Sequence, residues 1–345
     1  MTRRILLGLL VLGPAVVVVD LIGAPDMLLF ILAAAALIPL AWLIGEATEH
    51  AAHHTGPGVG GFLNATFGNA PELIIALFAV HEGLTEVVRG SLTGSVIGNL
   101  LLVLGFSLLF GGKGALDRES SFVSLGLVGL ATLLFLIPSI PGWDGNPERH
   151  ALARLSLPVS IVLLLVYVAV TWYTLRRHRR RYVVDEATTF EAWSLPVSLL
   201  VLAAATVVTA FVAEILVHTL ETFAEKAHLT DFFVAAVIVA IVGNAAEHGG
   251  AVVVAARGKI MLAAEIALSS SAQVAVFLIP AVALIAWAID PLALSFRPVE
   301  MAVLGGSTLL AAAVLWDGRS SRFRGGLLIA AYVAAAGAFF LAGDR

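Results

Sequence analysis

Two short segments of the chain combine an amide, a carboxylate and a glycine inside long apolar stretches. Residues 68–72 read Gly-Asn-Ala-Pro-Glu, and residues 243–247 read Gly-Asn-Ala-Ala-Glu. A charged side chain at the centre of a bilayer costs at least roughly 2.5 to 3.5 kcal/mol. Two carboxylates at matched positions of a repeated motif therefore indicate a function in the membrane.

The spacing within each motif predicts a site for a hard cation. Positions i and i+3 of a helix share a face, so Asn69 projects beside Glu72 and Asn244 beside Glu247. Together the four side chains offer two negative charges and at least four oxygens. Calcium takes 6 to 8 oxygen ligands in flexible geometry, which suits this set. We therefore expect Glu72 and Glu247 to bind Ca²⁺.

The same two carboxylates are suited to binding protons. Burial disfavours the charged form of a carboxylate, so without a cation Glu72 and Glu247 should take up protons. A divalent cation then competes with protons for the same oxygens. This alternation predicts an antiporter, a transporter rather than an enzyme, which carries Ca²⁺ and H⁺ and needs no cofactor.

Backbone features of the motifs support ion binding. Gly68 and Gly243 carry no side chain, which allows a neighbouring helix or an ion to approach the backbone. Pro71 lacks an N–H, so the carbonyl of Phe67 loses its helical partner. Free carbonyls that line a cavity coordinate cations in transporters.

Polar residues also occur in the helices that follow each motif: Ser95 and Asn99 after the first, Ser270 and Gln273 after the second. They either complete the ligand set or join helices by hydrogen bonds, as small polar residues commonly do in membranes. Both interpretations stay open.

Other ionisable residues are candidates for an ion entrance or a proton path. Glu46 and Glu49 end an apolar stretch, and Glu214 lies at the corresponding depth later in the chain. His248 either relays protons or joins two helices. The cluster His50–His54 and the residue Glu265 have no assigned role; zinc binding by the histidines and a solvated helix end both remain open.

The composition identifies an integral membrane protein. Of the 345 residues, 60% are hydrophobic and 13% charged, and the mean hydropathy is +0.99. Cysteine is absent, which excludes disulfides and thiolate metal sites. The net charge of -4 gives no reason to expect a nucleic-acid partner. Partners should be membrane lipid, Ca²⁺ and protons, and a homo-oligomer is left open.

Breaks at Gly, Pro and charged clusters predict an all-α fold with eleven transmembrane helices. They are expected at residues 4–22, 27–52, 60–80, 87–111, 121–140, 152–175, 193–222, 229–256, 259–288, 298–316 and 324–341.

One offset of 175 residues relates Glu72 to Glu247 and Ser95 to Ser270. This offset predicts an extra first helix over 1–26, five-helix repeats over 27–175 and 193–345, and a basic cytoplasmic linker over 176–192. Because five is odd, the second repeat enters the membrane from the opposite side. Inverted repeats around a midplane site are the architecture of secondary transporters.

Lys and Arg residues predict the orientation. With the N-terminus in the cytoplasm, 14 of the 20 fall on the inner side, and the C-terminus is external. The six exceptions are Arg89, Arg149, Arg154, Lys226, Arg297 and Arg345. The expected location is a bacterial inner membrane.

At these residues the chain closely resembles the cation/proton exchanger (CAX) branch of the calcium/cation antiporter superfamily. The resemblance is carried by residues 36–41, 45–49, 56–57, 60–74, 94–95, 99–105 and 242–248. It implies calcium/proton antiport, with Glu72, Glu247, Asn69 and Asn244 as ion-site residues and Ser95, Asn99, Ser270 and Gln273 near them. Ser269, Glu265 and Met261 depart from the family's usual residues, and the linker is basic where several relatives are acidic.

Three other functions compete with calcium/proton antiport. The same fold could be coupled to sodium or carry another cation. A membrane-embedded metal-dependent hydrolase would need a water-activating metal triad, and the chain has no HExxH pattern. A passive cation channel is disfavoured because channels are usually symmetric oligomers.

Overall fold

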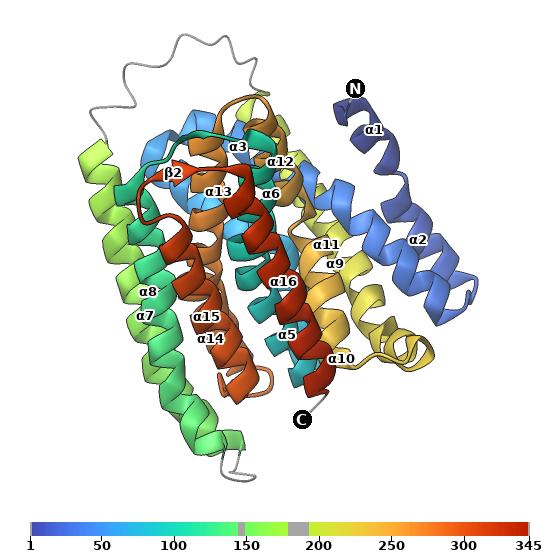
Figure 1. The fold of residues 1–345 in the computed structure, drawn as a ribbon. Helices are drawn as coiled ribbons and strands as arrows, with labels where there is room; N and C mark the ends of the chain where they lie inside the picture. The colour runs from blue at the N-terminus through green and yellow to red at the C-terminus, as the bar shows by residue number, and fades with distance from the viewer. Residues whose placement is uncertain (1, 144–148, 179–192, 344–345) are drawn as a thin grey trace.

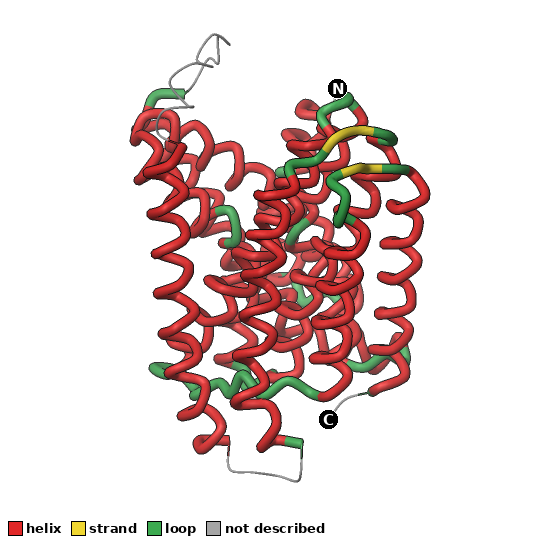
Figure 2. Tube along the Cα trace, turned by 60° about the vertical axis from the view of Figure 1, so that its left-hand side comes forward, coloured by secondary structure: helices red, strands yellow, loops and turns green. Residues whose placement is uncertain are grey.

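The structure is a computed structural model that describes residues 2–143, 149–178 and 193–343. Nearly all of these residues lie in helices that run side by side along one direction, and the two chain ends lie at opposite ends of the bundle (Figure 1). The strands β1 (Gly114–Ala115) and β2 (Arg319–Ser320) pair antiparallel, with Gly114 opposite Ser320. Figure 2 shows this short ribbon at the end of the bundle where the N-terminus lies.

Within the described residues, the first half of the chain forms ten helical elements. They are α1 (Thr2–Leu9), α2 (Leu12–Leu21), α3 (Asp26–Phe67), α4 (Ala70–His81), α5 (Thr85–Ile97), the π-helix η1 (Gly98–Val103), α6 (Leu104–Gly111), α7 (Arg118–Ser139), the 3-10 turn η2 (Ile140–Gly142) and α8 (Arg149–His178).

The second half forms ten more. They are α9 (Leu195–Ala227), α10 (Asp231–Phe233), the π-helix η3 (Val234–Val239), α11 (Ala240–Gly243), α12 (Ala245–Ala256), α13 (Ile260–Gln273), the π-helix η4 (Val274–Leu278), α14 (Ile279–Ala286), α15 (Pro298–Val314) and α16 (Arg322–Ala342). The predicted linker over 176–192 begins inside α8, and from residue 179 on it lies outside the described residues.

The predicted all-α membrane fold is confirmed. In the described part of the chain, 8 helices are long and apolar enough to cross a membrane, and a bent pair over residues 231–256 makes a ninth. Two shorter apolar helices, α4 and α15, have 12 and 17 residues. The count of eleven spans stays a prediction, because these two fall short of the length of the others.

Both motifs interrupt helices that the sequence predicted to be continuous. The helix expected over 60–80 is instead divided between α3 and α4, and the predicted loop after residue 52 is part of α3. The helix expected over 229–256 breaks at Asn244, where α11 and α12 meet, and the two segments are bent by 59°. Asn69 (φ -103°, ψ 19°) and Asn244 (φ -89°, ψ 5°) occupy the matching breaks.

Each break has a local cause. Pro71 stands in the first turn of α4, where its missing N–H does no harm, and it prevents α3 from continuing through this point. In the second motif, the side-chain amide of Asn244 donates to the carbonyl of Ala240 at 2.9 Å, while its backbone N–H reaches the same carbonyl only at 3.3 Å. Such side-chain bonds compete with the regular helical ladder.

Small residues bring α5 and η3 into backbone contact. A Cβ atom added to Gly90 would lie 2.8 Å from the carbonyl oxygen of Phe232, and one added to Gly94 would lie 2.0 Å from that of Ala236. Glycines at spacing four allow close approach of membrane helices, because packing rather than the hydrophobic effect holds such helices together. This crossing fixes Ser95 and Asn99, further along the α5–η1 helix, against the second motif.

Candidate cation-binding site

The two motifs meet at the side chain of Glu72. A Cβ atom added to Gly243 would lie 3.5 Å from both Cγ and Oε1 of Glu72. The carboxylate of the first motif therefore rests on the glycine of the second. Glu72 is buried, with 6% of its surface exposed, and Glu247 is half-buried.

The asparagines of the two motifs hydrogen-bond to opposite halves of the chain. Asn69 Nδ2 donates to Gln273 Oε1 at 3.4 Å, so the first motif contacts α13. Asn244 Nδ2 donates to Ser95 Oγ at 2.8 Å, so the second motif contacts α5. Each motif thus binds the helix that follows the other motif. The expectation that each asparagine shares a helix face with its own glutamate does not include this exchange.

A serine connects the second glutamate to the polar centre. Ser270 Oγ donates to Glu247 Oε2 at 2.5 Å and accepts from Asn99 Nδ2 at 3.0 Å. Asn99 Nδ2 also lies 3.5 Å from Asn244 Oδ1. Asn99 belongs to the π-helix η1, and such segments are frequent at functional sites. Ser95, Asn99, Ser270 and Gln273 therefore hydrogen-bond to motif residues and join helices, and a role as cation ligands stays a prediction.

Helix ends reinforce the site. Glu72 lies in the first turn of α4, and Glu247 lies in the first turn of α12. The N-terminal end of a helix carries partial positive charge, which stabilises a carboxylate there. The first motif also places Phe67 at the end of α3 and half-buried Gly68 at the break, and the residue four positions after Phe67 is Pro71, which has no N–H to donate.

Several buried atoms near the motifs have no hydrogen-bond partner among the described residues. Glu72 Oε2, Asn99 Oδ1 and His248 Nε2 are among them. Native proteins leave few buried polar atoms unpaired, and the first two are oxygens of the kind that bind hard cations. His248 is half-buried, and its Cε1 lies 3.9 Å from the point where a Cβ on Gly98 would stand. One role considered for His248 is a hydrogen bond that joins two helices. The Nε2 atom of His248 does not form such a bond with a described residue.

The predicted entrance residues are not part of the hydrogen-bond network of the motifs among the described residues. No hydrogen bond or ion pair joins Glu46, Glu49 or Glu214 to the motifs within the described part of the chain. Glu46 is half-buried and binds Arg3 at 2.7 Å. Glu49 and Glu214 are both exposed.

The histidine cluster anchors the start of the second half. His50 stacks on Trp193 with ring centroids 4.1 Å apart and accepts from its backbone N–H at 3.1 Å. His54 Nε2 bonds the carbonyl of Trp193 at 2.7 Å. Among the described residues, no three His, Asp or Glu side chains gather closely enough to hold a metal. Glu265 is exposed and accepts from Ser120 Oγ at 3.2 Å, which joins α13 to α7.

The structure also contains a buried charge cluster that sequence reasoning missed. Glu300, fully buried at the start of α15, accepts from Arg297 Nε at 2.9 Å and lies 3.7 Å from Arg89 Nη2. Arg297 Nη1 donates to the carbonyl of Gly343, near the chain end opposite the N-terminus. The sequence contains a signal for this cluster, because Glu300 interrupts an apolar stretch and Arg297 stands three residues before it.

Known proteins match this chain over nearly its whole length. The family model described as "Sodium/calcium exchanger protein" matches residues 26–176 and 197–341. The Ca²⁺/H⁺ antiporter ChaA of Bacillus subtilis is 40% identical over 340 residues, which cover 95% of this chain and 96% of that protein. The vacuolar cation/proton exchanger 1a of rice is 37% identical over 336 residues, covering 91% of this chain and 74% of that protein.

A solved structure shows the same arrangement of helices. The structure of native YfkE superposes with a TM-score of 0.84 at 37% identity, covering 97% of this chain and 99% of that one. The relatives are named as antiporters and exchangers, that is, as transporters rather than enzymes. The predicted resemblance is confirmed: this chain belongs to the sodium/calcium exchanger protein family, together with Ca²⁺/H⁺ antiporters and vacuolar cation/proton exchangers.

Proposed function

We propose that this protein is a calcium/proton antiporter in which Glu72 and Glu247 bind Ca²⁺ and protons alternately. The observation that carries the proposal is the contact between Glu72 and Gly243, which brings the carboxylate of the first motif against the backbone of the second. The names of the similar proteins support calcium and protons as the exchanged ions.

The two carboxylates provide a simple physical basis for exchange. Two ionised glutamates neutralise one Ca²⁺, and the same two glutamates are neutral when each holds a proton. The site then has the same net charge in both loaded forms, which avoids the cost of an uncompensated charge inside the bilayer. Protons that arrive from one side release the cation to the other side.

Asn69 and Asn244 complete the proposed site, and the backbone of Phe67, Gly68 and Gly243 lines it. Ser95, Asn99, Ser270 and Gln273 hold these groups in place through the hydrogen bonds described above. Glu46, Glu49, Glu214 and His248 remain proposals for the paths by which ions or protons reach the centre.

We further propose that residues 27–175 and 193–345 are inverted repeats. Matching helix breaks at Asn69 and Asn244 and the exchanged hydrogen bonds of the two asparagines support this division. Residues 1–26 then form an additional N-terminal segment. The excess of Lys and Arg on one side supports a cytoplasmic N-terminus, and the Bacillus relative supports a bacterial inner membrane.

Flux in proteoliposomes tests the function. Vesicles that hold a fluorescent Ca²⁺ indicator and an acidic interior should take up external Ca²⁺ as protons leave. Glu72→Gln and Glu247→Gln should each reduce this uptake to the level of protein-free vesicles, whereas Glu82→Gln, at an exposed site that ends α4, should not. Normal uptake by Glu72→Gln would contradict the proposed site.

Sodium coupling is the second candidate, because the matching family model is named for sodium/calcium exchangers. Vesicles loaded with Na⁺ at equal pH on both sides, with a protonophore present, separate the two. Calcium uptake under these conditions would favour sodium coupling over proton coupling.

A further inference from the structure

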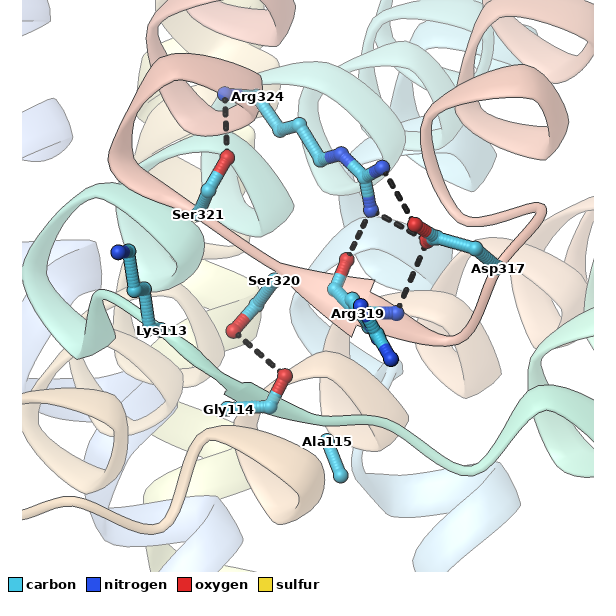
Figure 3. A pocket seen from close by; sticks show the side chains of 8 residues that line it. All are labelled: Lys113, Gly114, Ala115, Asp317, Arg319, Ser320, Ser321 and Arg324. Atoms are coloured by element: carbon cyan, nitrogen blue, oxygen red, sulfur yellow. Dashed lines mark hydrogen bonds and ion pairs between the residues drawn. The ribbon is translucent and has the colours of Figure 1, made fainter.

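A basic groove lies on the N-terminal face of the bundle, between the β1–β2 ribbon and the start of α16 (Figure 3). Its volume is about 480 Å³. The side chains that define its chemistry are Lys113, Asp317, Arg319, Ser320, Ser321 and Arg324. None of them belongs to the proposed cation site.

The walls of the groove are held in place by backbone pairing. Ser320 Oγ donates to the carbonyls of Gly112 at 2.7 Å and Gly114 at 3.2 Å, which adds to the pairing of the two strands. A Cβ added to Gly114 would lie 2.5 Å from Ile260 Cγ2, so the ribbon rests directly on the start of α13. The groove therefore has a fixed shape.

The groove carries a surplus of positive charge. Arg324 binds Asp317 through two hydrogen bonds, at 2.5 and 2.8 Å, and also donates to the carbonyl of Arg319. This pair is neutral. The side chains of Lys113 and Arg319 are both exposed and form no hydrogen bond or ion pair with any described residue. In Figure 3, Lys113 stands apart from the Asp317–Arg324 pair.

Exposed aromatic residues place the groove at the surface of the membrane. Trp316, just before Asp317, is 64% exposed, and Phe323, in the first turn of α16, is 81% exposed. Phe323 also lines an adjoining groove of about 530 Å³ that contains Lys113 and Arg322. Aromatic side chains at the ends of membrane helices lie at the level of the lipid headgroups. The two unpaired cations are therefore at the depth of lipid phosphates.

We propose that this groove binds the phosphate of an anionic phospholipid headgroup. Lys113 and Arg319 supply the positive charge, and the guanidinium group of Arg319 can donate two hydrogen bonds to one phosphate. Phe323 and Trp316 contact the glycerol and the upper acyl chains. The loop between α6 and α7 is thereby linked to α16 through a lipid as well as through the β-ribbon.

Native mass spectrometry of the delipidated full-length protein in detergent tests the site. Phosphatidylglycerol should bind, and phosphatidylcholine with the same acyl chains should bind much more weakly. Each Lys or Arg near an anionic lipid surface contributes enough to change binding by about fivefold. Lys113→Gln and Arg319→Gln should each weaken phosphatidylglycerol binding by about that factor, and Lys113→Arg should retain it.

The control is Arg257→Gln, which removes an exposed cation at the end of α12 that lies outside both grooves. An equal loss of phosphatidylglycerol in this control would show a general charge effect and overturn the site. Displacement of the lipid by millimolar inorganic phosphate would instead indicate a soluble anion as the occupant. Because the substituted residues are exposed, unchanged melting temperatures should accompany the loss of lipid.

Discussion

The side chain of Glu72 packs against Gly243, the first residue of the other motif. Its Cγ and Oε1 lie 3.5 Å from where a Cβ on Gly243 would stand. Because Gly243 has no side chain, nothing at this position covers the carboxylate of Glu72 on the side that faces the second motif. The size of the residue at position 243 should therefore control access to Glu72.

Substitutions at Gly243 should separate folding from transport. The distance of 3.5 Å is an ordinary van der Waals contact, so Gly243→Ala should fold normally but cover part of the carboxylate and slow Ca²⁺ uptake. Gly243→Leu should displace Glu72 and abolish uptake. Gly249→Ala, in the neighbouring helix α12, is the matched control, because a Cβ there meets nothing within 4 Å. Full activity of Gly243→Leu in the vesicle assay would show that Glu72 is not used where the structure places it.

The repeated motif is sufficient to predict that Glu72 and Glu247 act together, because two carboxylates in apolar sequence require a common explanation, and this joint action stays a prediction. The contact between Glu72 and Gly243 could not be predicted in the same way. The i, i+3 rule relates residues of one helix, whereas this contact depends on breaks at Asn69 and Asn244 that change which residues share a face.

The exposed face of α9 can be read from its polar residues. Glu214, His218, Glu221 and Glu225 follow one another at spacings of four, three and four residues, which places them on one helical face. The structure exposes these four and buries Val212, Ala213, Ile215 and Leu216. The spacing does not say what this face meets, so a role of Glu214 in an ion path stays a prediction.

Ser270 and Ser271 offer a matched pair for testing the polar centre. Ser270 donates to Glu247, whereas the hydrogen bonds of its neighbour Ser271 to described residues go to the carbonyls of Ala267 and Val96. A hydrogen bond to a charged group contributes about 1.5 to 3 kcal/mol. Ser270→Ala should therefore raise the KM for Ca²⁺ by about tenfold or more, while Ser271→Ala should leave it near the wild-type value. Equal values for the two variants would remove Ser270 from the site.

Glu300 should be essential for stability. It is fully buried between Arg89 and Arg297, and removal of its charge leaves the two guanidinium groups with less compensation. Breaking a buried ion pair costs about 3 to 5 kcal/mol. Glu300→Gln should therefore lower the melting temperature measured by fluorescence-detected size exclusion. The exposed Glu82→Gln should not lower it, and similar melting curves for the two variants would argue against a stabilising charge cluster.

The ion pair between Asp317 and Arg324 should make the β2 loop insensitive to pH in the physiological range. The hydrogen bond from Arg324 lowers the pKa of Asp317 from 3.8 to about 2. A carboxylate with a lowered pKa stabilises the folded loop fully above its unfolded pKa, and that contribution is lost as the pH falls toward the folded value. Between about pH 5 and about pH 8 the pair should therefore stay intact, and it should weaken only below about pH 4. Hydrogen exchange of the segment around β2, corrected for the intrinsic rate, should show constant protection over the higher range. Asp317→Asn should show lower protection at every pH in that range, and a wild-type loop that loosens between about pH 7 and about pH 5 would mean that another group controls it.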